Sequence, residues 1–85
     1  MAYITSIERM AKEEGRREGR EEARREGRQE ILREAILDAL EVRFGTIPES
    51  IRERVNATTD ESRLRDWHHR AVVCATLPDF QQAIA

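Results

Sequence analysis

The segment EGRREGREEARREGRQE, residues 14–30, constrains the fold of this 85-residue chain more than any other segment. Nearly every residue in it is charged, yet a small residue returns at every fourth position: Gly15, Gly19, Ala23 and Gly27. Because glycine costs a helix about 1 kcal/mol relative to alanine, its recurrence at helical spacing needs a cause. Three interpretations are open: two closely paired helices, a single solvated helix, or a flexible linker.

The charges beside these small residues are ordered. Each small residue follows a Glu and precedes an Arg, so a helix would carry a Glu row (Glu14, Glu18, Glu22, Glu26) and an Arg row (Arg16, Arg20, Arg24, Arg28). Within one helix, like charges four residues apart are mildly destabilising, with some relief from Arg17–Glu21 and Glu21–Arg25 pairs. Between two parallel copies the Glu edge faces the Arg edge, whereas antiparallel copies oppose Arg to Arg. If the groove is an interface, the charges predict a parallel homodimer, wound right-handed because the repeat exceeds 3.6 residues.

Apolar spacing predicts one long helix over about residues 4–44. Ile4, Ile7 and Ala11 begin a stripe that Thr5 or Ser6 can cap, and apolar residues recur at intervals of three and four over 31–44. Such a helix is about 60 Å long. Its apolar C-terminal half supports a dimer even if the repeat does not.

The rest of the chain predicts three short helices. Gly45 ends the long helix, and Pro48 suits the first turn of the next one, which turns Ile51 and Val55 inward. Thr58 with Glu61, and Thr76 with Asp79, have capping-box spacing. The helix after the first of these caps runs through Leu64, Trp67, His68, Ala71, Val72 and Ala75, and the last helix carries Leu77, Phe80 and Ile84. There is no alternating strand pattern.

The predicted fold is therefore all-α and dimeric: a long N-terminal helix followed by a compact cluster of three short helices. Residues 1–30 form a charged oligomerisation stalk, and residues 31–85 form a small helical domain. The predicted dimer interface consists of Gly15, Gly19, Ala23 and Gly27 for close approach and Ile31, Ile36, Leu40, Phe44 and Trp67 for apolar burial.

Charge balance argues against binding to nucleic acid. Fourteen of the 15 basic residues are Arg, but residues 1–30 hold eight basic and eight acidic side chains, and the net charge is −2. A binder of polyanions needs a net positive face. The chain has one cysteine, no signal-peptide pattern and no apolar run long enough for a membrane span, so we expect a cytoplasmic protein.

The reactive side chains do not form a catalytic pattern. His68 and His69 are adjacent in the sequence, so on a helix their side chains point in different directions and do not suit a single metal ion. Asp66 has the spacing to pair with His69 or Arg70, but such pairs are common on exposed helix faces. We expect Cys74 to be a small residue buried in the core. We expect Trp67 to pack in the core and not to form a surface that binds a ligand. We therefore expect no enzyme activity, no metal site and no cofactor.

Two stretches resemble a known family. YITSIERMAKEEGRREGREE is similar to the segment that follows the nuclease domain in the Rpn family (recombination-promoting nuclease/putative transposase). LEVRFGTIPESIRERVNATTDESRLRDWHHRAVVCATLPDF resembles the small C-terminal domain of unknown function of that family. The shared pattern falls on Arg43-Phe44-Gly45, Ile47-Pro48, Val55, Leu64, Trp67, Leu77 and Phe80, whereas the family has an apolar residue where His68 stands.

The resemblance implies that this chain lies after the α/β catalytic core of such a nuclease. No catalytic residue is carried over, since Asp79 lacks the partner motif. Met1 is then an introduced start or a genuine internal one. In the family, a short internally started C-terminal product acts as an antitoxin on the full-length nuclease. The resemblance thus implies pairing with that nuclease and its inhibition; the alternative is a truncated structural dimerisation module with no independent role. An autonomous DNA-binding module is disfavoured by charge.

Overall fold

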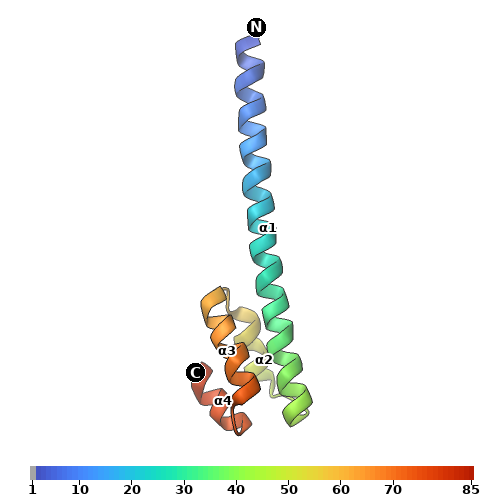
Figure 1. Cartoon of the computed structure of the whole chain (residues 1–85), viewed down its shortest axis with the longest axis vertical. Helices are drawn as coiled ribbons and strands as arrows, with labels where there is room; N and C mark the ends of the chain where they lie inside the picture. The colour runs from blue at the N-terminus through green and yellow to red at the C-terminus, as the bar shows by residue number, and fades with distance from the viewer. Residues whose placement is uncertain (1) are drawn as a thin grey trace.

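The protein is a long helix with a small helical domain at its C-terminal end, as the computed structural model shows (Figure 1). The structure describes residues 2–85, with side chains for Met10 and for residues 12–85. The helices are α1 (Ala2–Phe44), α2 (Glu49–Ala57), α3 (Glu61–Val73) and α4 (Leu77–Ile84). The molecule measures 67 × 19 × 18 Å, and the described residues contain no strand. The all-α prediction of one long helix and three short ones is confirmed.

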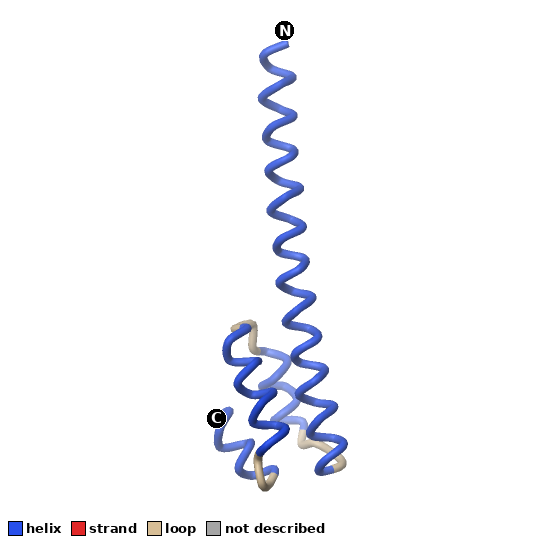
Figure 2. The backbone as a smooth tube through the Cα atoms, in the orientation of Figure 1, coloured by secondary structure: helices blue, strands red, loops and turns tan. Residues whose placement is uncertain are grey.

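Helix α1 runs through the charged repeat without a break (Figure 2). This continuity removes the flexible linker from the three interpretations of the repeat. Thr5 and Ser6, predicted as caps, lie inside α1, which begins at Ala2. The side chains of Ile4, Ile7 and Ala11, the predicted start of the apolar stripe, lie outside the described residues.

The ends of the helices follow local chemistry. Gly45 has a φ of +81°, the left-handed conformation that ends a helix, and its N–H donates to the Glu41 carbonyl. Pro48 precedes the first residue of α2. Thr76 caps α4 by accepting a hydrogen bond from the Asp79 N–H at 3.3 Å, as its spacing predicted.

The predicted cap of α3 was wrong. Asp60, not Thr58, is the N-cap residue, and its Oδ1 accepts from the N–H groups of Ser62 and Arg63. The Thr58 hydroxyl instead donates to the Arg54 carbonyl at the end of α2. Asp is as good a cap as Thr and lies nearer to the helix, so it takes the role.

The hydrophobic core lies where the C-terminal part of α1 meets the three short helices. Its buried side chains are Ile36, Leu40, Ile47, Ile51, Val55, Leu64, Trp67, Ala71, Phe80 and Ile84. Two positions predicted to face inward, Val72 and Ala75, are exposed, and His68 is half-buried. Helix α3 ends at Val73, before Ala75, and Val72 lies about 100° from the buried Ala71.

Three arginines connect the ends of helices to neighbouring helices. Arg33 donates to the Thr58 carbonyl after α2, Arg43 to the Ala71 and Cys74 carbonyls at the end of α3, and Arg54 to the Ile84 carbonyl at the end of α4. The last carbonyls of a helix have no partner within it and carry partial negative charge. Each of the three guanidinium groups donates to one or two carbonyls at a helix end, which gives these three arginines a structural role.

Candidate functional site: the exposed stalk of α1

The N-terminal part of α1 extends away from the domain and has no partner within the described chain (Figure 1). Every described side chain from Met10 to Glu26 is exposed. The first described ion pair with the domain is that of Arg28 with Glu61, at 2.8 Å. Within the predicted stalk of residues 1–30, the name stalk is used from here on for residues 10–27.

The small residues of the stalk have no role within one chain. A Cβ atom added to Gly15, Gly19 or Gly27 would meet no atom within 4 Å, and φ is not in the left-handed region at these positions. Alanine would therefore fit at each of the three and would favour the helix by about 1 kcal/mol. Either glycine at these positions favours contact with another chain, or it lowers the stability of the stalk helix without any compensating contact.

The charged rows of the stalk are free to pair. Among the described side chains, no ion pair joins two stalk residues, and the predicted Arg17–Glu21 and Glu21–Arg25 pairs are not formed. The Glu row on one edge and the Arg row on the other are therefore not neutralised by ion pairs among the described stalk side chains. A surface of this kind gains from a partner that offers the opposite charge to each edge.

Three of the residues predicted for the dimer interface are buried in the chain's own core. Ile36 and Leu40 have no exposed surface and Trp67 has 5%. Phe44 is half-buried against the same core. Ile31, by contrast, is 67% exposed on the opposite face of α1. The structure thus leaves Ile31, Gly15, Gly19 and Ala23 exposed and Gly27 half-buried, whereas Ile36, Leu40 and Trp67 are buried within one chain.

The reactive side chains have structural contacts. Cys74, half-buried at the end of α3, accepts a hydrogen bond from Arg43 through its Sγ at 3.3 Å and lies 3.8 Å from the Ala71 carbonyl. His69 is exposed beside the half-buried His68. Asp66 forms an ion pair with Arg70 at 2.8 Å. Within the part of the chain described, no three His, Cys, Asp or Glu residues lie together as metal ligands would.

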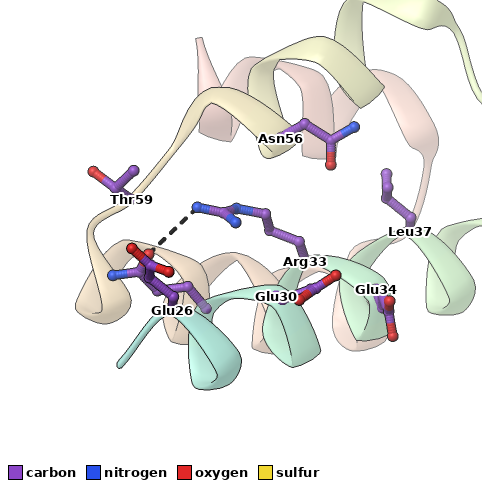
Figure 3. A pocket seen from close by; sticks show the side chains of 8 residues that line it. Glu26, Glu30, Arg33, Glu34, Leu37, Asn56 and Thr59 are labelled. Atoms are coloured by element: carbon purple, nitrogen blue, oxygen red, sulfur yellow. Dashed lines mark hydrogen bonds between the residues drawn. The ribbon is translucent and has the colours of Figure 1, made fainter. Parts of the chain in front are cut away.

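One groove of the domain surrounds Arg33 (Figure 3). It measures about 610 Å³ and lies between α1 and the end of α2, with Glu26, Glu30 and Glu34 on the α1 side and Asn56 and Thr59 across from them. The Arg33 guanidinium crosses the groove to the Thr58 carbonyl, with Nε at 3.0 Å and Nη2 at 2.8 Å. Because these donors are engaged and the rim is acidic, the groove does not suit an anion.

The helix-capping arginines were not predicted from the sequence. The contacts of Arg33, Arg43 and Arg54 span 25, 28 and 30 residues along the chain, so no local spacing reveals them. The only available signal was the choice of Arg over Lys at nearly every basic position. Arg can fork two hydrogen bonds onto carbonyl oxygens, which Lys does with less geometric precision.

Comparison of the chain with protein-family models, with curated proteins and with solved structures gives no match in any of the three. The structure itself adds one finding about membranes. No described helix is both long and apolar enough to cross a bilayer.

Proposed function

We propose that this chain is a non-catalytic oligomerisation and regulatory module that pairs through its stalk with a parallel copy of the same segment. The observation that carries the proposal is the exposed small-residue row of α1. Gly15, Gly19 and Gly27 cost helix stability, and nothing within the chain requires them. Close approach of a second helix backbone is the physical benefit that small residues at four-residue spacing provide.

The charges favour a parallel pair of stalks. The Glu row and the Arg row lie on opposite edges of the small-residue row and are all exposed up to Glu26. A parallel copy sets Glu against Arg on both edges, and an antiparallel copy sets Arg against Arg. Each exposed pair contributes only about 0.2–1 kcal/mol, so the charges select orientation more than they supply affinity.

The partner that we propose is a full-length Rpn-like nuclease carrying the same segment. The resemblance rests on the Arg43-Phe44-Gly45 turn and the Leu64 and Trp67 pair, and the structure gives these residues physical roles. Arg43 bonds the end of α3, Gly45 ends α1, and Leu64 and Trp67 are buried in the core. A domain of this fold on both proteins would present the same stalk on each.

Inhibition would then follow from mixed pairing. A short chain that occupies the stalk of the nuclease replaces one nuclease copy in the dimer and so removes one of its two catalytic cores. The short chain needs no catalytic group, metal or cofactor for this. The alternative is that the module only holds copies of a larger protein together and has no independent regulatory role.

Co-expression tests the proposal. The chain, produced together with a full-length nuclease that carries the matching stalk, should suppress the toxicity of the nuclease. The Gly19→Leu variant should lose suppression because leucine blocks close approach. Arg17→Leu is the matched control: it adds the same side chain about 160° away on the helix and should retain suppression. If the wild-type chain leaves toxicity unchanged while still forming dimers, the structural alternative is correct.

A further inference from the structure

We draw no further inference here: the strongest candidate, the acidic groove between α1 and the end of α2 around Arg33, is a cluster of carboxylates whose buried neighbour Gln29 already accepts a hydrogen bond from Arg33, and nothing in the described part of the structure shows what would bind there.

Discussion

Arg43 Nη1 donates a hydrogen bond to the main-chain carbonyl of Ala71 at 2.7 Å and so joins the end of α1 to the end of α3. The same guanidinium also reaches the Cys74 carbonyl and the Cys74 Sγ. One side chain therefore satisfies two carbonyls at the end of α3, the nearer of them 28 residues further along the chain. This contact explains in physical terms why the Arg43-Phe44-Gly45 turn begins with an arginine.

We expect Arg43→Ala to lower the free energy of unfolding by about 1–2 kcal/mol, because a charged donor to partly buried carbonyls is lost. Arg43→Lys should recover only part of this, since one ammonium cannot reproduce the forked contact. Urea denaturation followed by circular dichroism measures both. Equal stability of wild type and Arg43→Ala would show that the contact contributes nothing.

Gly45 gives a second stability prediction. Its φ of +81° disfavours any residue with a Cβ, although no atom lies within 4 Å of the position a Cβ would take. Gly45→Ala should therefore cost about 1 kcal/mol through backbone strain alone. Gly45→Asn should cost less, because Asn adopts this conformation more readily. Thermal unfolding of the two variants decides the order; an Ala variant as stable as wild type would refute the strain argument.

The cap of α3 can be assigned by a pair of variants. Asp60→Ala removes the acceptor for the Ser62 and Arg63 N–H groups and should destabilise the domain by about 1 kcal/mol. Thr58→Val removes only the hydroxyl that bonds to the Arg54 carbonyl and should cost less. A larger loss for Thr58→Val, measured by chemical denaturation, would restore the capping box predicted from the sequence.

The sequence predicted the helices well because their signals are local. Gly45 and Thr76 mark helix ends by their own conformation or hydroxyl, and the spacing over 31–44 defines one long helix. The cap at Thr58 failed because Asp60 offered a competing acceptor two residues later. The confirmed helix ends and the wrong cap both depend on residues that are close together in the sequence, not on contacts between distant residues.

The candidate site was predicted less well for a different reason. Apolar spacing shows that Ile36, Leu40 and Trp67 are buried, but it does not show which chain covers them. The structure covers all three with the chain's own helices. The exposure of Ile31, on the other side of α1, could be known only once the position of the short helices was known.

Gly19→Leu distinguishes a paired stalk from a solvated one. Leucine favours a helix over glycine by close to 1 kcal/mol, and the site is open, so a solitary helix should gain stability. In a closely paired stalk, the same change should weaken dimerisation at least about tenfold, or about 1.4 kcal/mol. Sedimentation equilibrium measures the second effect, with Arg17→Leu as control. Equal loss of association in both variants would show that leucine disturbs the stalk wherever it is added, and would contradict close approach at Gly19.

The most direct test of parallel pairing is the distance between two spin labels, one on each copy, at Thr46→Cys in a Cys74→Ser background. Thr46 is exposed just beyond the end of α1, outside the proposed pairing surface. A parallel pair brings the two labels within about 30 Å of each other, since packed helices lie about 8–10 Å apart. An antiparallel pair centred on the stalk separates them by about 80 Å, at 1.5 Å per residue along the helix. The short distance supports the parallel stalk; the long distance, or no coupling between copies, contradicts it.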